Sequence, residues 1–340
     1  MDVLWSSLPS LTAFFKCLPA DTWYEEDHEK ITAAIGWDDE YSQYSKSHTR
    51  RVLGWYQDPT GSPFPNLTDL SVTWDDEDAL SLTYLPCLVT NKLCSLQLSA
   101  SETATNGFTD NSIRLALRSL FNRCSGLQCL QVVVSEPVAL VIADEVIPRL
   151  VEFPRLHTLE FDADQEWNLE SLYQVGRHPA LKHVKLNLTG TDWRKHARSL
   201  VAKSLFPALQ TMKLTLTHGA DSFHLIRMLA STTLSRIEVY HRTYVMAAVD
   251  LQSILEEIAS HRHSLTNVKL MVYDYDQAEA MGDGFRSPQP PYIVQEYHLQ
   301  PLLSLNHLRD LTISLETLID IDDGWTEATK SHFGRNVTIR

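Results

Sequence analysis

The sequence predicts an α/β solenoid, in which a curved parallel sheet carries helices on its outer side. Three observations predict it: a proline stands two residues ahead of a leucine at several places, the pattern Leu-x-x-apolar-x-apolar follows, and apolar residues at helical spacing lie between these segments. The proline phrases are Phe64-Pro65-Asn66-Leu67, Phe153-Pro154-Arg155-Leu156, His178-Pro179-Ala180-Leu181 and Phe206-Pro207-Ala208-Leu209. A helix and strand that repeat at a fixed period are typical of solenoids.

Nine leucine-led segments make up the repeat. Their apolar triplets are Leu67/Leu70/Val72, Leu93/Leu96/Leu98, Leu127/Leu130/Val132, Leu156/Leu159/Phe161, Leu181/Val184/Leu186, Leu209/Met212/Leu214, Leu234/Ile237/Val239, Leu265/Val268/Leu270 and Leu308/Leu311/Ile313. Successive segments start 25 to 34 residues apart, except for the last two, which are 43 apart. Apart from one long insertion, these intervals fit leucine-rich repeats.

Each segment is predicted to be a strand with one buried face. From Met212 onward, residues 209–216 alternate apolar and polar side chains, which is the period of a half-buried strand. The upstream proline has a fixed φ and no amide hydrogen. We therefore expect it to end the preceding helix and to start the strand.

Helices are predicted between the strands. Apolar residues at helical spacing are Ile113, Leu117, Leu120 and Phe121 after Asp110, Leu251, Ile254, Leu255 and Ile258 after Asp250, and shorter sets at Leu169, Leu172 and Tyr173 and at Trp193, Ala197, Leu200 and Val201. Asp110 and Asp250 are candidate N-caps. The repeating unit is thus a helix followed by a strand.

A doubly wound sheet and an eight-stranded barrel also alternate helix and strand. Parallel strands that are covered on both faces usually read as unbroken apolar runs, whereas here Thr211 and Lys213 interrupt the core positions. The chain has only 12 glycines and no glycine-rich loop after these strands, so the phosphate-binding turn of a nucleotide fold is missing. Both patterns favour the solenoid.

Composition limits the classes of partner. Hydrophobic residues make up 44% of the chain and charged residues 21%, which predicts a folded, soluble protein. A net charge of -14 disfavours nucleic acid and anionic membrane surfaces, because both attract positive patches. The longest apolar stretch, residues 132–147, is interrupted by Glu136, Pro137, Asp144 and Glu145, so no membrane span is predicted.

The five cysteines show no metal or redox spacing, and we expect buried or half-buried thiols. Residues 1–19 lack the features of a secretory signal, which favours the cytosol or nucleus. The sequence has no Gly-x-Ser-x-Gly nucleophile elbow, no phosphate-binding loop and no His-Glu-x-x-His zinc helix. It therefore predicts no enzyme, cofactor or metal site. His261-Arg262-His263 follows a predicted helix and is interpreted as a helix-end cap.

Two regions differ from the repeats. Residues 1–60 are rich in Trp and Tyr and are interpreted as a helical N-terminal cap or a degenerate first repeat. Residues 61–340 form the predicted solenoid. A Gly- and Pro-rich loop near residues 276–292 explains the long last interval.

The residues carry a resemblance. The run Leu4-Trp5-Ser6-Ser7-Leu8-Pro9-Ser10-Leu11, the later Cys17-Leu18-Pro19-Ala20-Asp21-Thr22-Trp23 and the Phe-Pro-x-Leu strands are similar to the F-box and leucine-rich-repeat family of mushroom-type fungi. In that family the F-box binds the adaptor of a cullin-based ubiquitin ligase and the repeats capture a substrate. Here acidic residues 24–30 stand where the apolar F-box helix is expected. The resemblance therefore implies adaptor binding only if an F-box lies upstream or docking persists without one.

Alternation predicts a binding surface. It places the residues between core positions on the exposed strand face, which lines the concave wall of a solenoid. The predicted wall contains Glu160, Asp162, His183, Lys185, Lys213, Arg236, Glu238, Tyr240 and Lys269. Mixed charge with one aromatic suits a polar protein surface, and we expect charge reversal at Lys185, Lys213 and Arg236 together to abolish partner capture.

Three functions stay open at this point. The first is a protein-binding module, such as the substrate receptor that the resemblance implies. The second is a structural scaffold or a family remnant that has lost ligase docking and has no dedicated ligand. The third is an enzyme without a visible motif, using His183, His241 and Asp162.

Overall fold

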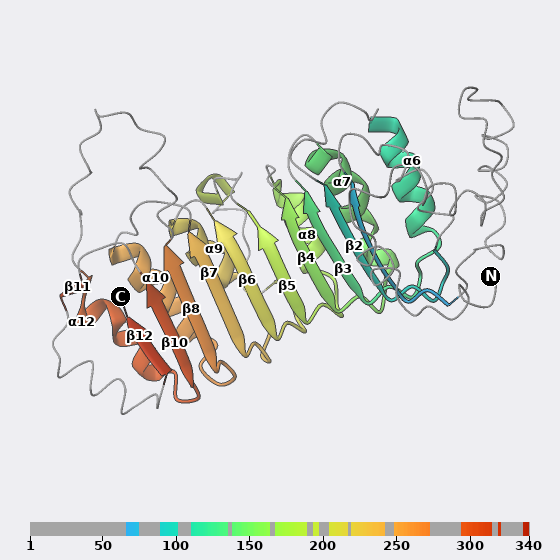
Figure 1. Ribbon diagram of the computed structural model, residues 1–340. Coiled ribbons are helices and arrows are strands. Elements are labelled where there is room, and N and C mark those ends of the chain that lie inside the picture. The colour runs from blue at the N-terminus through green and yellow to red at the C-terminus, as the bar shows by residue number, and fades with distance from the viewer. Residues whose placement is uncertain are drawn as a thin grey trace, which may run out of the picture. The chain divides into compact units, whose positions relative to one another are not determined.

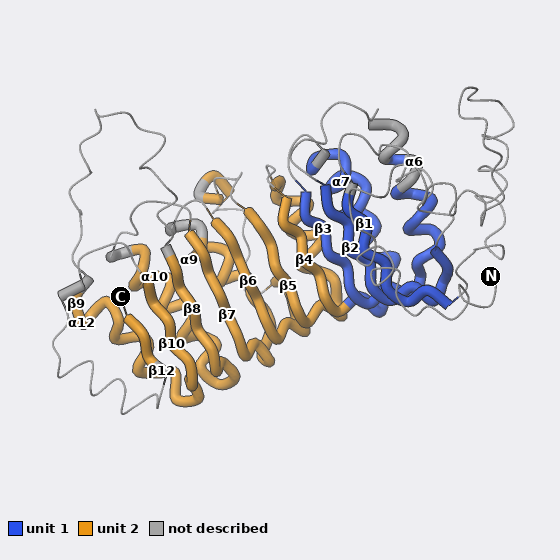
Figure 2. Tube along the Cα trace, viewed as in Figure 1, with its two compact units in different colours: residues 1–156 blue, residues 157–340 orange. Residues whose placement is uncertain are grey.

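The computed structural model describes residues 66–74, 89–100, 110–134, 138–163, 167–188, 193–196, 204–216, 219–241, 248–272, 294–314, 319–320 and 336–339 (Figure 1). These residues form α/β structure with parallel strands. Contacts divide the chain into unit 1, residues 1–156, and unit 2, residues 157–340 (Figure 2). The predicted N-terminal cap, residues 1–60, and the predicted loop near residues 276–292 lie outside the described residues.

The described part of unit 1 contains three parallel strands in the order β1-β2-β3. Its elements are β1 (Asp69–Trp74), β2 (Ser95–Ala100), α6 (Asp110–Phe121), β3 (Cys129–Val134), α7 (Val138–Val146) and the 3-10 helix η4 (Ile147–Glu152). Leu70 pairs with Leu96, and Leu96 pairs with Leu130. Equivalent positions of successive triplets thus stand side by side, and α6 contacts α7.

In the described part of unit 2, seven parallel strands of one sheet follow one another in chain order. They are β4 (Thr158–Ala163), β5 (His183–Asn187), β6 (Thr211–Leu216), β7 (Arg236–His241), β8 (Asn267–Val272), β10 (Asp310–Ser314) and β12 (Asn336–Ile339). The helices between them are α8 (Leu169–Gly176), η5 (Trp193–His196), α9 (Gly219–Arg227), α10 (Ala248–Ala259), α12 (Glu296–Leu299) and η6 (Gln300–Ser304). A separate parallel pair joins β9 (Val294–Gln295) to β11 (Ile319–Asp320).

The nine predicted strands are confirmed, and the apolar triplets form the core. Every triplet residue is buried, with at most 4% of its surface exposed, except Val72 on β1, which is half-buried. Burying such side chains stabilises a fold by about 1.5 to 3 kcal/mol each. The period of two along each segment therefore identifies the buried face of every predicted strand.

A turn with the same hydrogen bond precedes five of the strands. In each, the first leucine of the triplet donates its backbone N–H to the carbonyl three residues earlier. The pairs are Leu93 to Thr90, Leu127 to Cys124, Leu156 to Phe153, Leu209 to Phe206 and Leu308 to Leu305, at 2.9 to 3.3 Å. Successive strands also begin with the same pair of backbone hydrogen bonds to the preceding strand. For example, the carbonyl of Lys182 accepts from the N–H groups of Gln210 and Thr211 at 2.8 and 2.9 Å. The repeat in sequence is thus also a repeat in backbone geometry.

The proline phrases do not all end helices. Pro154 follows η4 and Pro179 follows α8, as predicted, but Pro207 follows an isolated bridge at Leu205. There Phe206 has a φ of 57°, which places it in the left-handed region. This conformation costs about 1–2 kcal/mol. Burial of the phenyl ring and a hydrogen bond from its N–H to the carbonyl of Gly176 offset the cost.

Two predicted N-caps lie inside their helices. α10 begins at Ala248, so Asp250 stands in its first turn, where its negative charge still interacts favourably with the helix dipole. Asp110 is the first residue of α6. At α8 the cap is Asn168, whose Oδ1 accepts from the N–H of Ser171 at 2.7 Å. The apolar face predicted for α10 is fully buried.

The described cysteines agree with the expected thiols. Cys94 and Cys129 are half-buried and Cys124 is buried, and all three are free thiols. Burial raises the pKa of Cys124 to about 12, so its thiol stays protonated at neutral pH.

None of the helices in the described residues is long and apolar enough to cross a bilayer.

Candidate functional site

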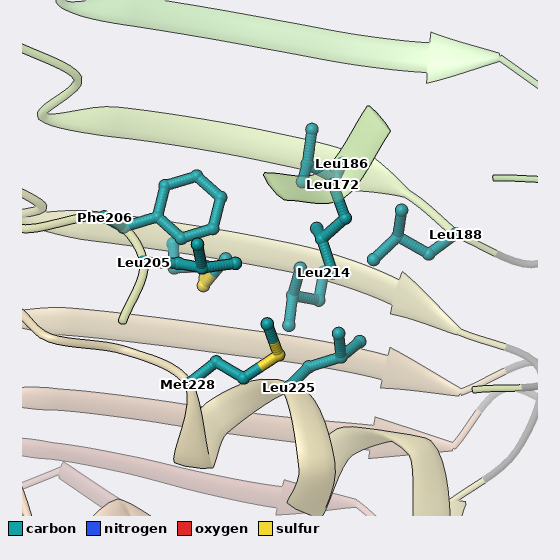
Figure 3. A pocket seen from close by; sticks show the side chains of 9 residues that line it. Leu172, Leu186, Leu188, Leu205, Phe206, Leu214, Leu225 and Met228 are labelled. Carbon is teal, nitrogen blue, oxygen red and sulfur yellow. The ribbon is translucent and has the colours of Figure 1, made fainter. Parts of the chain in front are cut away.

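The strands of unit 2 present a polar face opposite the core. The described helices α8 and α9 pack against the core side, where Leu172, Leu225 and Met228 meet Leu186 and Leu214 (Figures 1 and 3). Side chains of alternate residues point to the other side of each strand. The predicted wall residues stand on that other side, which we call the strand face.

One row of the strand face crosses six strands. Register pairs Glu160 with Lys185, Lys185 with Lys213, Lys213 with Glu238, Glu238 with Lys269 and Lys269 with Thr312. We call these six residues the central row. Neighbouring strands lie about 4.8 Å apart, so successive side chains of the row are in reach of each other. The stacking order predicted from the repeats is confirmed.

The β4–β5 end of the face is held by ion pairs. Nζ of Lys185 bonds to a carboxylate oxygen of Glu160 and lies 3.0 Å from Oδ2 of Asp162. Nδ2 of Asn187 donates to the other oxygen of Asp162 at 3.1 Å. Burial acts to lower the pKa of Lys185, but the bonds to the two carboxylates outweigh it and raise the pKa above its ordinary value. Lys185 is therefore an internal partner.

Glu238 is the centre of a second group on β7. Nε of Arg236 donates to Oε1 of Glu238 at 2.6 Å, and the hydroxyl of Tyr240 donates to Oε2 at 2.6 Å. Burial acts to raise the pKa of Glu238, but these two hydrogen bonds and the charges of Arg236 and Lys213 outweigh it. The pKa lies below its ordinary value, so Glu238 is ionised at neutral pH with both oxygens satisfied.

Two lysines flank the ring of Tyr240. Nζ of Lys213 on β6 lies 4.8 Å from the ring centroid, and Nζ of Lys269 on β8 lies 5.3 Å from it. Both distances suit cation–π attraction, worth about 0.5 to 2 kcal/mol. Within the part of the chain that the structure describes, neither amine forms an ion pair. We call Lys213, Tyr240 and Lys269 the lysine–tyrosine cluster.

His183 is held in a neutral state. Its Nδ1 lies 2.8 Å from the hydroxyl oxygen of Thr211 on the adjacent strand. Burial is the main cause that lowers the pKa of His183, and the positive charges of His157 and Lys182 add to it. The imidazole therefore contributes a hydrogen bond rather than a charge to the strand face at neutral pH.

Most residues of the predicted wall are less exposed to solvent than the alternation of the strands suggests. Arg236 is exposed, whereas Glu160, Asp162, His183, Lys185, Lys213 and Lys269 are half-buried. Glu238 is only 8% exposed and Tyr240 only 6%. Long side chains on the neighbouring strands cover them, so their main contacts are inside the protein. Reversing the charge of Lys185 or Arg236 would break an internal pair, and those residues do not make clean test positions.

The three residues of the enzyme hypothesis do not meet. His183 and Asp162 stand on the strand face, whereas His241 has the core parity of Ile237 and Val239 on β7 and is fully buried. There Nε2 of His241 lies 3.2 Å from the hydroxyl oxygen of Ser222, which is also fully buried. This pair has no access for a substrate and acts as a polar contact between α9 and β7.

The core side of unit 2 encloses a small apolar cavity of about 10 Å³ (Figure 3). It is lined by Leu172, Leu186, Leu188, Leu205, Phe206, Met212, Leu214, Leu225 and Met228. A space of this size is at most about one water in volume, and an apolar lining offers water no partner. The cavity is a packing defect.

Among the described residues, no cluster of His, Cys, Asp or Glu could hold a metal ion.

Comparison with protein-family models gave no match, and no curated protein matched the sequence. The structure defines an α/β protein with parallel strands in chain order.

The contacts of the lysine–tyrosine cluster were not predicted from the sequence. Aligning the triplets places Lys213, Glu238 and Lys269 side by side, because each stands between the second and third apolar residues, and so brings both lysines to the strands that flank Tyr240.

Proposed function

We propose that this chain is a leucine-rich-repeat-like solenoid that binds a partner protein on the strand face of unit 2. The strands within each unit follow chain order, and the same turn hydrogen bond recurs before five of them. Such nearest-neighbour stacking of similar units is how solenoids are built. In a solenoid the strand face is concave, and a concave face suits a protein partner.

The observation that carries the binding proposal is the order of the central row. Charged side chains on β4, β5 and β7 are held by polar contacts: Lys185 by two carboxylates, and Glu238 by Arg236 and Tyr240. Preorganised polar groups lose little conformational entropy when a partner binds, which favours affinity and specificity. A surface of ordered charges with a central aromatic is typical of a recognition surface.

The resemblance to the F-box and leucine-rich-repeat family extends this proposal to a substrate receptor of a ubiquitin ligase in the cytosol or nucleus. In that case the strand face captures the substrate. Adaptor binding would require an F-box upstream or docking without one. Recovery of the ligase adaptor and cullin with the protein would support this extension.

A scaffold without a dedicated ligand is the second candidate. It is favoured by the β4–β5 end of the face, where Lys185, Glu160 and Asp162 satisfy one another. Exposed ion pairs of this kind contribute little, usually under about 1 kcal/mol. On this reading the row only holds strands in register.

Affinity capture from the native extract separates the two candidates. The full chain is compared with Thr312→Arg, which puts a bulky charge into the central row, and with the matched Glu256→Arg on the exposed side of α10. Binding at the strand face predicts that the same proteins are lost with Thr312→Arg and kept with Glu256→Arg. Equal recovery with both variants would contradict the proposed function and favour the scaffold.

A further inference from the structure

We propose that the lysine–tyrosine cluster is the docking point for an acidic segment of the partner protein. This inference rests on the proposed function and names the chemistry that the strand face recognises. It follows from the balance of charge on β6, β7 and β8, from the geometry of the two amines, and from the opposite charge at the β4–β5 end.

Positive charge is in excess at the centre of the face. On β6, β7 and β8, Lys213, Arg236 and Lys269 stand around a single carboxylate, Glu238. The carboxylate of Asp310, on the next strand β10, accepts a hydrogen bond from Asn267. Both oxygens of Glu238 already accept hydrogen bonds from Arg236 and Tyr240. Lys213 is close enough to Glu238 to lower its pKa, but within the described residues neither Lys213 nor Lys269 forms an ion pair, on a chain whose net charge is -14. Carboxylates of a partner would supply the missing counter-charge.

The two amines are placed rather than mobile. Each lies against the same ring, which is 6% exposed and tied through its hydroxyl to Glu238. Lys213 and Lys269 are half-buried, so part of each side chain stays accessible to a partner while its amine lies against the ring. A carboxylate that binds both amines meets a site that is already formed, which favours charge-assisted hydrogen bonds.

The β4–β5 end favours a short acidic segment over nucleic acid. Glu160 and Asp162 there share one cation, Lys185, which leaves negative charge in excess. β4 lies two strands from β6, or about 10 Å, which is about one Debye length at physiological salt. A continuous polyanion along the row would meet this repulsion, whereas a segment with acidic residues over β6–β8 only would avoid it.

Selection of short random peptides displayed on phage, with the immobilised full chain as bait, tests the inference. Selected peptides are synthesised with a fluorophore, and their affinity is measured by anisotropy. The test variant is Lys213→Met with Lys269→Met, which keeps the stems on Tyr240 and removes both charges. The matched control is Lys182→Met with Arg262→Met, because both residues are exposed and the loss of net charge is the same.

We expect the selected peptides to be rich in Asp and Glu, to bind at least about tenfold more weakly to the test variant, and to bind the control like the parent chain. Their affinity falls as salt is added. Thermal unfolding checks that the variants are folded, and the single variants Lys213→Met and Lys269→Met replace a double variant that is not.

The inference is overturned by neutral or basic peptides, by acidic peptides that bind both double variants equally, or by the absence of any selected peptide. If neutral or basic peptides lose binding to Thr312→Arg, the proposed function stands without this inference. A single-stranded oligonucleotide that binds the parent chain and not the test variant would also overturn it.

Discussion

The hydroxyl of Tyr240 donates a 2.6 Å hydrogen bond to Glu238, two residues earlier on the same face of β7. The contact ties an aromatic ring to a buried carboxylate, and the ring in turn positions lysines on both neighbouring strands. The stability of the strand face and the recognition that we propose for it therefore share residues.

Glu238→Gln is expected to destabilise the protein by about 1 to 3 kcal/mol, because the amide cannot replace the charged acceptor of the Arg236 and Tyr240 hydrogen bonds. Urea unfolding monitored by circular dichroism measures the change. Glu256→Gln on the exposed side of α10 is the control, with an expected change within about 0.5 kcal/mol. Equal stability of the two variants would show that the Glu238 contacts contribute nothing.

The advantage of the parent chain over Glu238→Gln should depend on pH. The pKa of Glu238 is lower in the folded than in the unfolded state. Its contribution to stability is therefore complete above the ordinary glutamate pKa, about 4.3, and is lost as pH falls through the folded pKa. Unfolding free energies of both proteins, measured at a series of pH values, should differ constantly above about pH 5 and converge below it. A difference unchanged under acid conditions would contradict this account.

Tyr240→Phe and Tyr240→Ala separate the hydroxyl from the ring. Removal of the hydroxyl leaves Glu238 with one donor fewer, at a cost of about 1 to 3 kcal/mol. Loss of the ring should raise the cost to about 3 to 5 kcal/mol, because a buried aromatic leaves a cavity. Tyr297→Ala, at a residue 56% exposed, is the control for chemical denaturation. If Tyr240→Phe and Tyr240→Ala cost the same, the ring packs less than its burial indicates.

Gly126→Ala is expected to destabilise unit 1. A Cβ at this position would lie 2.7 Å from the backbone carbonyl oxygen of Asn91, which is closer than real Cβ contacts allow. Relief requires a backbone shift, which we expect to cost about 1 to 3 kcal/mol. That exceeds the gain of about 0.4 to 1 kcal/mol from a less flexible unfolded chain. Thermal unfolding against the neighbouring Ser125→Ala checks it, and a more stable Gly126→Ala would refute the close approach.

The triplets were sufficient to predict nine strands because a period of two, repeated at nearly constant intervals, leaves little freedom in which side of each strand is buried. Aligning the triplets also predicted the register, as the pairing of Lys213 with Glu238 confirms. Local pattern and long-range packing agree in the nine predicted strands.

Several elements were missed, and two of them, β12 and α7, were missed for opposite reasons. β12 is four residues long and has no leading leucine, so its pattern was too short to recognise. α7 is apolar on almost all sides, with Ala139, Val141, Ile142 and Ala143 buried, and therefore lacks the one-sided period that identifies a surface helix. The first segment carries too little pattern, and the second carries an apolar residue on its exposed side too, where Leu140 is 49% exposed.

The candidate site was predicted in position and not in exposure. Alternation places Glu238 and Tyr240 on the strand face, but it says nothing of how much the neighbouring side chains cover them. Coverage depends on which long side chains the adjacent strands bring to the same row, here Lys213 and Lys269. The sequence of one strand does not show which side chains of its neighbours will cover it, because that depends on the register between the strands.

Site-specific photo-crosslinking in the native extract tests the central claim most directly. A photoreactive phenylalanine derivative is placed at Thr312, in the central row, and in a second protein at Glu256, on the exposed side of α10. If unit 2 binds its partner on the strand face, a specific crosslinked protein appears with the probe at position 312 and is absent at position 256. Crosslinks that are equal at both positions, or that appear only at position 256, would contradict the account.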